Sequence, residues 1–375
     1  MNRITALDML RGYALAAIML NHMPGGVLRR VTIGNVAVFD AAELFVLLSG
    51  FLVGLVWLKT EETQGRRAAQ KRFIRRAAQV WLALVIGSVL MALTSRALFE
   101  AGLPHTAIWT EYARWIIEVP IGYVVTVGLL WMQPNLMDVL ALYVVLLALT
   151  PLTVPLMLRW PWVFVAAALA IWAAAIPLNG YLPNHRSQNG MLFNPFGWQL
   201  LFHSGVMLGL YRDRIMPVLR RHARLLTTLA VLWLIFGLAM AQLWRYGPEM
   251  KQVFYALRDI VGPVDKWSLD WVRYSGIMAG AWLVAVPLAQ PMARLADTVI
   301  GRALAVIGRG GLVSFVACVL LSVIGDALMT PVGARAADAP VLPRLAVEIW
   351  TLGVLWLVAE IEARRSRSRK GRATR

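Results

Sequence analysis

Cysteine is almost absent from this sequence, since Cys318 is the only one among 375 residues. One cysteine cannot form an intramolecular disulfide, and no cluster of thiols is present to bind a metal. The chain also lacks a glycine-rich phosphate loop and the His/Cys spacings of metal sites. The sequence therefore indicates no redox chemistry, no metal and no tightly bound cofactor.

Acidic residues are also scarce: 20 Asp and Glu stand against 37 Lys and Arg, which gives a net charge of +17. Such a charge would suit nucleic acid, but here the basic residues fall between apolar runs and form no soluble basic face. Hydrophobic residues make up 59% of the chain, more than the roughly half that is usual in soluble domains. These features predict a multi-pass membrane protein with no nucleic-acid partner.

The distribution of charge predicts the topology. Loops 59–80 and 212–224 are rich in Lys and Arg, which places them in the cytoplasm by the positive-inside rule, whereas most acids lie in the opposite loops. We expect an all-α membrane protein with both termini cytoplasmic, a single domain over 1–362 and a basic tail over 363–375 that contacts lipid headgroups. The ten expected spans are 4–23, 41–58, 78–97, 136–157, 161–177, 196–211, 225–243, 271–291, 311–330 and 343–361.

One further apolar run, 119–132, is ambiguous. At about 14 residues it is short for a membrane span and better suits an interfacial or re-entrant element. A crossing there would also place the basic tail outside, against the positive-inside rule.

The first apolar run carries three ionisable residues, Asp8, Arg11 and His22. Such residues are costly at membrane depth unless they face a partner or a water-filled cavity. On an α-helix Arg11 and His22 lie about 20° apart around the axis and roughly 16 Å apart along it, and Asp8 shares their face. This predicts two polar stations at different depths in one cavity. The same spacing also suits an Asp8/Arg11 pair that anchors the helix at the interface, with His22 solvated at its end.

A second acidic group opens the next run. Asp40 and Glu43 stand three residues apart, shortly after His22. A carboxylate that holds one nitrogen of a histidine orients the ring, and the other nitrogen can then accept a proton from a hydroxyl. The alternative is favourable charge in the first turn of a helix.

Further polar residues enter the spans from the outer side. Asp138 and Tyr143 begin the run at 136–157, where Asp138 also suits a first-turn acid. In "FNPFGWQLLFHSG" we expect Asn194 to cap a helix. Gln199 and His203 are four apart and can bond across one turn. Trp198 is either an aromatic platform for a sugar or an interfacial belt residue. His105, His185 and His222 lie in loops and are expected to be solvated.

Four blocks together resemble one family: "LDMLRGYALAAIMLNH", "FDAAELFVLLSGFLVG", "MDVLALYVVLLALTPL" and "FNPFGWQLLFHSG". They are similar to the OpgC proteins of the acyltransferase type 3 superfamily. The Arg–His spacing and "FVLLSGFL" resemble the superfamily motifs, whereas "DAAE" with "NPFGWQ" resembles OpgC in particular. The C-terminal third is less similar, because Val316, Ala317 and Cys318 stand where relatives often have a histidine.

This resemblance implies an acyltransferase type 3 transmembrane fold in a bacterial inner membrane. It implies transfer of a succinyl group from cytoplasmic succinyl-CoA, or another acyl-CoA, to hydroxyls of periplasmic glucans. His22 would be the base, oriented by Glu43 or Asp40, and Arg11 would hold the donor. Either direct transfer or an acyl-histidine intermediate is compatible with these residues. The substrate-binding candidates are Asp8, Arg11, Asn21, Ser49, Asp138, Tyr143, Asn194, Trp198 and Gln199, of which Asn21, Ser49 or Gln199 would stabilise the oxyanion.

Two alternatives follow from the same residues. One is an O-acetyltransferase that acts on another envelope polysaccharide. The other is a proton-coupled transporter. Such carriers usually show repeated halves with interrupted helices, and this sequence shows no such repeat. The sequence does not indicate an oligomeric state.

Overall fold

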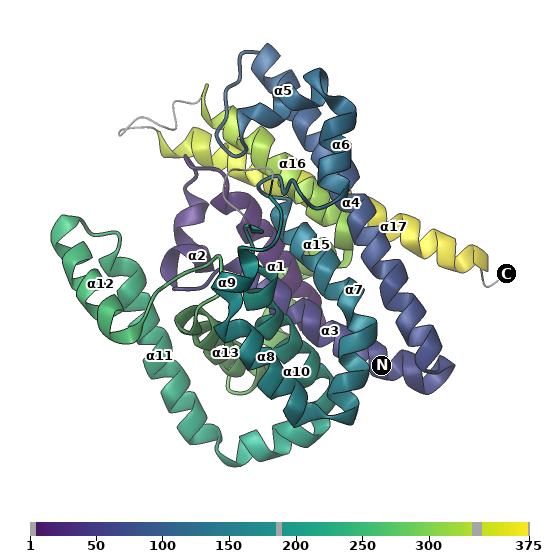
Figure 1. The fold of residues 1–375 in the computed structure, drawn as a ribbon. Coiled ribbons are helices and arrows are strands. Elements are labelled where there is room, and N and C mark those ends of the chain that lie inside the picture. The colour runs from purple at the N-terminus through teal and green to yellow at the C-terminus, as the bar shows by residue number, and fades with distance from the viewer. Residues whose placement is uncertain (1–4, 185–189, 332–339, 374–375) are drawn as a thin grey trace.

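The computed structural model describes residues 5–184, 190–331 and 340–373, and all regular secondary structure in these ranges is helical (Figure 1). This confirms the all-helical fold class. The helices are α1 (Thr5–Asn21), η1 (Leu28–Val31), α2 (Ile33–Val36), α3 (Ala41–Gln64), α4 (Arg66–Glu100), α5 (Thr110–Glu118), α6 (Pro120–Gly128), α7 (Asp138–Arg159), α8 (Pro161–Ala173), α9 (Ala175–Asn179), α10 (Pro195–Arg221), α11 (Ala223–Leu243), α12 (Pro248–Val261), α13 (Trp271–Ala285), α14 (Ala289–Ala296), α15 (Val299–Arg309), α16 (Gly311–Met329) and α17 (Val341–Ala373).

All ten expected spans are helical, but 161–177 is divided between α8 and α9, and 271–291 between α13 and α14. Among the described residues, six helices are long and apolar enough to cross a membrane, namely α3, α4, α7, α11, α16 and α17. A seventh crossing arises if α13 and α14, which meet at 75°, are counted as one broken span. The remaining expected spans are shorter or more polar: α1 has 17 residues, α8 has 13, and α10 carries charges in its second half. The chain is a multi-pass membrane protein; ten crossings and cytoplasmic termini stay predictions.

The ambiguous run at 119–132 forms α6, a helix of nine residues. Nine residues rise about 14 Å, roughly half the hydrocarbon thickness, so α6 does not cross as one helix. Pro120 at its first position separates it from α5, because proline suits the start of a helix but not its interior. Figure 1 shows α5 and α6 together beside one end of α4.

The central contact of the bundle joins α3 to α10. Each helix carries a glycine pair four residues apart, Gly50 and Gly54 on α3 and Gly205 and Gly209 on α10. A Cβ atom at any of these positions would collide with backbone of the other helix. The glycines therefore let the two backbones approach closely, as small residues at this spacing do in membrane helices.

A second close contact joins α1 to α15. A Cβ atom on Gly12 would strike the Leu304 carbonyl, and one on Gly308 would strike the Asp8 carbonyl. Helix α16 also packs against α1, and α17 packs in turn against α15 and α16. Helix α17 continues into the basic tail expected over 363–375, where Arg364 pairs with Glu360 at 2.9 Å.

Candidate active site

His22 lies in the turn that follows α1, next to the start of α3 and to the loop before α13. Its side chain is half-buried. The charged groups near enough to influence the imidazole are Lys266, Asp40 and Arg29. Arg29 and Asp40 follow His22 closely in the sequence, whereas Lys266 is more than 220 positions away, so tertiary packing brings Lys266 to this outer cluster.

Asp40 and Glu43 first of all begin α3. The Asp40 carboxylate accepts a hydrogen bond from the Ala42 backbone N–H at 2.8 Å, and Glu43 accepts one from the Asp40 N–H at 3.0 Å. This reciprocal arrangement is a capping box, which satisfies backbone donors that the helix leaves unpaired. The helix-start interpretation of these two acids is therefore correct.

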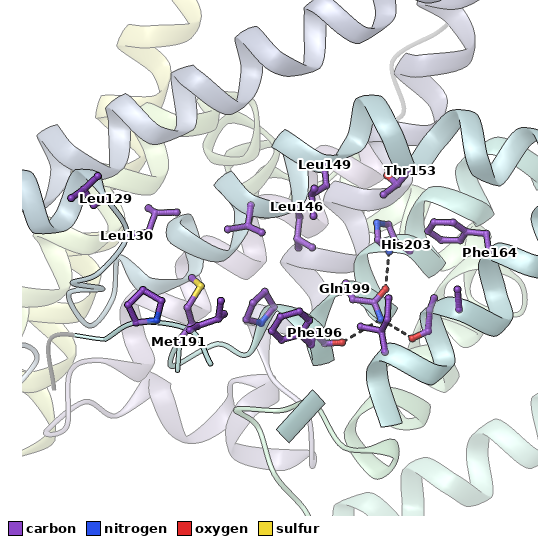
Figure 2. Close-up of a pocket in the computed structure, with 17 residues that line it drawn as sticks. Leu129, Leu130, Leu146, Leu149, Thr153, Phe164, Met191, Phe196, Gln199 and His203 are labelled. Carbon is purple, nitrogen blue, oxygen red and sulfur yellow. Dashed lines mark hydrogen bonds between the residues drawn. The ribbon is translucent and has the colours of Figure 1, made fainter. Parts of the chain in front are cut away.

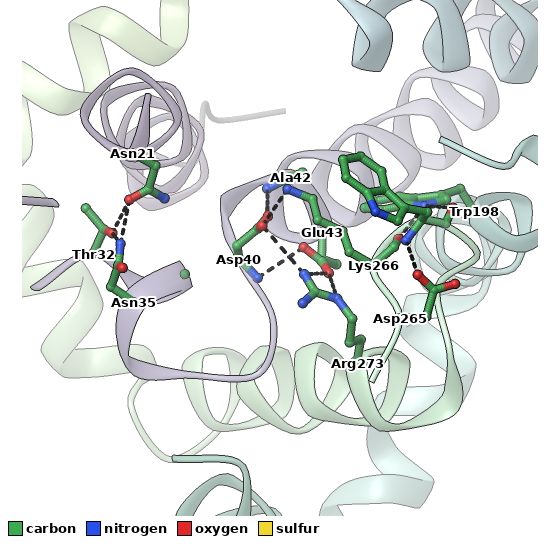
Figure 3. A network of polar contacts seen from close by, with 12 residues as sticks. Asn21, Thr32, Asn35, Asp40, Ala42, Glu43, Trp198, Asp265, Lys266 and Arg273 are labelled. Carbon is green, nitrogen blue, oxygen red and sulfur yellow. Dashed lines mark hydrogen bonds and ion pairs between the residues drawn. The ribbon is translucent and has the colours of Figure 1, made fainter. Parts of the chain in front are cut away.

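Two cations also bind the same carboxylates (Figure 3). Lys266 Nζ lies 2.7 Å from Asp40 Oδ2, and Arg273 Nη2 lies 3.5 Å from that oxygen. Arg273 Nε donates to Glu43 Oε1 at 2.6 Å, and Glu43 is 0% exposed. Asp270, the N-cap of α13, accepts from the Arg273 backbone N–H at 3.0 Å and fixes that residue. The network joins α3 to α13.

These contacts correct the expected orienting role of Asp40 and Glu43. Within the described part of the chain neither carboxylate hydrogen-bonds His22; both engage backbone and cations instead. Although burial opposes it, the charges of Lys266 and Arg273 lower the pKa of Asp40. Asp40 is therefore an anion whose charge is neutralised by these two cations.

The imidazole of His22 is neutral at pH 7. Burial, followed by the positive charge of Lys266, lowers its pKa to about 4, and the opposing effect of Asp40 is smaller. A neutral imidazole has a free lone pair on one ring nitrogen and can accept a proton.

Asn21 precedes His22 and is held by its amide oxygen. That oxygen accepts from Thr32 Oγ1 at 2.6 Å and from Asn35 Nδ2 at 2.8 Å. Figure 3 shows the amide nitrogen turned the other way, toward the side on which Asp40 lies. Since the oxygen is fixed by two donors, the orientation of the amide follows from the network. The nitrogen of Asn21 is an oriented hydrogen-bond donor beside His22.

Glu348 of α17 holds the loop after His22, and the sequence analysis did not single it out. Its carboxylate accepts from the Val27 N–H at 2.9 Å and the Leu28 N–H at 3.0 Å. It is fully buried and packs against Gly26, where a Cβ atom would collide with it. An isolated acid in an apolar run marks Asp8 as a candidate, and Glu348 in the run 343–361 shows the same pattern.

Asp326 of α16 plays a comparable role for another loop. Its Oδ2 accepts from the Thr106 N–H at 2.6 Å and the Ala107 N–H at 2.9 Å. Two buried acids of the C-terminal third thus fix loops of the N-terminal third.

The remaining candidates of the first helices lie deeper. Asp8 is buried and Arg11 half-buried toward the start of α1, near α15 and far along the axis from His22. Ser49 is buried within α3, past Glu43. The structure describes no contact between Ser49 and His22.

Asp138 and Tyr143 lie on α7. Asp138 is its first residue, and its Oδ1 accepts from the Val139 N–H at 2.9 Å. The Tyr143 ring packs edge-on against Phe45 at 6.1 Å and Phe202 at 6.2 Å between centroids. Tyr143 therefore packs between α3 and α10.

Asn194 caps α10 as expected, and accepts from the Phe196 and Gly197 backbone N–H groups. Trp198 differs from expectation. Its ring is 0% exposed, and its Nε1 donates to the carbonyls of Lys266 and Trp267 at 3.1 Å each. A ring without exposed surface offers no platform to a sugar, so Trp198 instead supports the loop that carries Lys266.

Gln199 and His203 form the predicted bond across one turn of α10, with 2.9 Å between Oε1 and Nδ1. They line an apolar cavity rather than the outer cluster. Of the loop histidines, His105 is buried and bonds Ser95 at 2.9 Å, which corrects the expected solvated state. His222 is exposed, and His185 lies outside the described residues.

A family model described as OpgC protein matches residues 3–367. The chain belongs to the OpgC family. Membership implies an acyltransferase-type enzyme and suggests a function like that of a glucan succinyltransferase. The match includes the C-terminal third, where the motifs are less similar and where Glu348 and Asp326 lie. A search of curated proteins finds no match.

Proposed function

We propose that this OpgC-family chain transfers a succinyl group from succinyl-CoA to hydroxyls of periplasmic glucans at a bacterial inner membrane, with His22 as the general base. The observation that carries the proposal is a neutral imidazole and an oriented amide donor on consecutive residues at the end of α1, where charged side chains gather.

The proposed step uses these two groups in a direct transfer. The lone pair of His22 takes the hydroxyl proton while the sugar oxygen attacks the thioester carbonyl. The Asn21 amide donates to the oxygen that becomes negative. Collapse of this intermediate breaks the carbon–sulfur bond, and the proton passes from His22 to the leaving thiolate. A succinyl ester and free CoA result.

Lys266 is the candidate for distinguishing succinyl from acetyl. A succinyl group ends in a carboxylate, which requires a cation near the reacting carbonyl. The side chain of Lys266 is 31% exposed, whereas that of Arg273 is 11% exposed. Lys266 therefore keeps surface for a second carboxylate beside Asp40.

The test is acyl transfer by purified protein in lipid nanodiscs. Radiolabelled succinyl-CoA and acetyl-CoA are offered in parallel with linear or cyclic glucan, and the glucan ester is identified by mass spectrometry. We expect succinyl glucan from the wild type and none from His22→Ala of unchanged thermal stability. Full transfer by His22→Ala removes His22 as the base, whereas preference for acetyl-CoA replaces succinyl transfer by acetyl transfer.

A further inference from the structure

A cavity of about 400 Å³ lies between α7, α8 and α10 and is separate from the outer cluster (Figure 2). Its walls are almost entirely apolar, and none of the described residues that line it is charged. The lining includes Leu130, Leu146, Leu149, Phe164, Ile171 and Phe196. Among the described lining residues, the polar side chains are those of Thr153, Gln199 and His203.

The imidazole of His203 presents an acceptor that nothing in the described structure satisfies. The amide nitrogen of Gln199 donates to the carbonyls of Ala168 at 2.7 Å and Phe196 at 3.2 Å, which makes its Oε1 the acceptor for His203 Nδ1. Nδ1 therefore carries the proton, and Nε2 has a free lone pair. His203 is only 6% exposed, and its Nε2 is buried with no hydrogen-bond partner among the described residues.

Thr153 supplies a second unsatisfied group at the same end of the cavity (Figure 2). Its Oγ1 is buried without a partner in the described chain. Thr150, one turn earlier, behaves differently, because its hydroxyl donates to the Leu146 carbonyl at 3.0 Å. One end of the cavity thus holds a free acceptor and a hydroxyl able to donate. Leaving such groups unpaired in a buried site costs about 1–3 kcal/mol each.

The ligand that matches these features is a hydrocarbon chain with one hydroxyl. A hydroxyl donates to His203 Nε2 and accepts from Thr153 Oγ1, while apolar walls take up the chain. The lack of charged lining argues against phosphates and carboxylates, and therefore against acyl-CoA. The lack of further polar lining argues against a sugar. The volume lies near the lower end of ligand pockets and suits a single chain.

We infer that this cavity binds a neutral single-chain lipid alcohol, with its hydroxyl between His203 and Thr153. The lining residues Leu129, Leu149 and Ile171 are exposed on the outside of the helix bundle. In a membrane protein such a surface faces lipid, so the bilayer itself supplies the ligand.

A second apolar depression provides an internal comparison. The groove between α11 and α13 has a volume of about 320 Å³ and is lined by Leu, Ala, Met and Trp side chains such as Leu226, Leu229 and Met278. None of its lining residues has an unsatisfied buried polar side-chain atom in the described structure. Labelling of this groove therefore measures how much lipid binds to an apolar surface that has no unsatisfied polar group.

The experiment uses the full chain in nanodiscs with a photoreactive long-chain alcohol and, in parallel, its methyl ether. The ether keeps the chain but cannot donate a hydrogen bond. Adducts are mapped and quantified by mass spectrometry. We expect the alcohol to label peptides of α7, α8 and α10 at least ten times more than the ether. Both probes should label the α11–α13 groove equally.

Substitutions identify the side chains that recognise the hydroxyl of the probe. Thr153→Val and His203→Phe should each reduce the alcohol-to-ether ratio to near one, and Thr153→Ser should restore it. Thr150→Val is the matched control and should leave the ratio unchanged. Equal labelling by the two probes in the wild type overturns the inference, as does a ratio that Thr153→Val does not alter. The readout is binding, so it is independent of whether the chain transfers succinyl groups.

Discussion

The outer cluster around His22 and the cavity beside His203 each contain one imidazole, the first in the turn after α1 and the second in the first half of α10. Around His22, charged groups of the stretch that follows it meet Lys266 and Arg273, and these two cations hold the carboxylates of Asp40 and Glu43. Around His203 there is no charged side chain among the described cavity lining, only an amide and a hydroxyl. The two sites are therefore suited to different molecules, one charged and strongly hydrated, the other a hydrocarbon.

The difference shows that a histidine in an apolar run does not by itself reveal its chemistry. Each histidine has one polar neighbour in the sequence: Asn21 precedes His22, and Ser204 follows His203. The partners from distant helices decide whether the imidazole meets a polar substrate or an apolar one. Four predictions test this contrast.

The largest expected effect separates the two histidines by activity. His22→Ala should lower the rate of acyl transfer about 10²–10⁴-fold, the usual contribution of a general base. His203→Phe should retain the rate within a few-fold, because His203 lies in the apolar cavity. Transfer of label from succinyl-CoA to glucan measures both. Equal losses of transfer rate in the two variants would contradict the prediction, because His203 would then matter to the reaction as much as His22.

The second prediction concerns the stability of the outer cluster. Arg273→Met leaves the buried Glu43 carboxylate without its cation, and breaking a buried pair costs about 3–5 kcal/mol. A marked fall in thermal unfolding temperature in detergent is the expected result. The matched control is Arg258→Met, which removes an exposed pair with Asp259 worth about 0–1 kcal/mol.

A double variant completes that test. Glu43→Gln combined with Arg273→Met removes both charges and should recover part of the lost stability. If Arg273→Met unfolds no earlier than Arg258→Met, the buried pair does not stabilise the junction of α3 with α13.

The third prediction addresses the loop after His22. Glu348→Ala removes the acceptor of the Val27 and Leu28 N–H groups, and hydrogen bonds to a charged group contribute about 1.5–3 kcal/mol each. We expect transfer to fall about ten-fold, mainly in kcat, while alcohol labelling beside His203 is unchanged. Glu348→Gln should keep part of the activity because its amide oxygen still accepts.

Glu360→Gln is the control for that substitution, since Glu360 lies on the same helix and pairs with Arg364 at the surface. A Glu348→Ala enzyme with wild-type kcat would remove the positioning role. A variant that loses transfer and alcohol labelling together would indicate general misfolding of the bundle.

The sequence predicted the helices well because hydropathy is a local property. All ten apolar runs are helical, although two of them are broken into two helices, and the cap at Asn194 and the Gln199–His203 bond followed from spacing within one turn. Each of these features depends on residues within a few positions of one another.

The candidate site was predictable only in part, because its contacts are not local. Arg273 lies 230 positions from Glu43, and Glu348 lies 321 positions from Val27. The sequence singled out Asp40 and Glu43 and assigned them to His22, because nothing local in the sequence indicates that Lys266 and Arg273 pair with them. His105 was misjudged for the same reason, as burial depends on the helices that cover a loop.

The smallest expected effect is a shift of the pH profile. A base of ordinary histidine pKa would lose half its activity near pH 6.5, whereas the pKa of His22 lies at about 4 because of burial and then of Lys266. Protonation inactivates a base, so the transfer rate should stay high through pH 5 and fall only toward pH 4. Lys266→Met removes a positive charge that disfavours the imidazolium, so the acid limb should move upward. The pKa of His22 should stay below 6.5 in this variant, because burial is the larger cause of its lowering and is retained. Initial rates between pH 4 and 8 measure it, with Lys251→Met on α12 as the control, and an acid limb at pH 6.5 in the wild type would show that His22 is solvated.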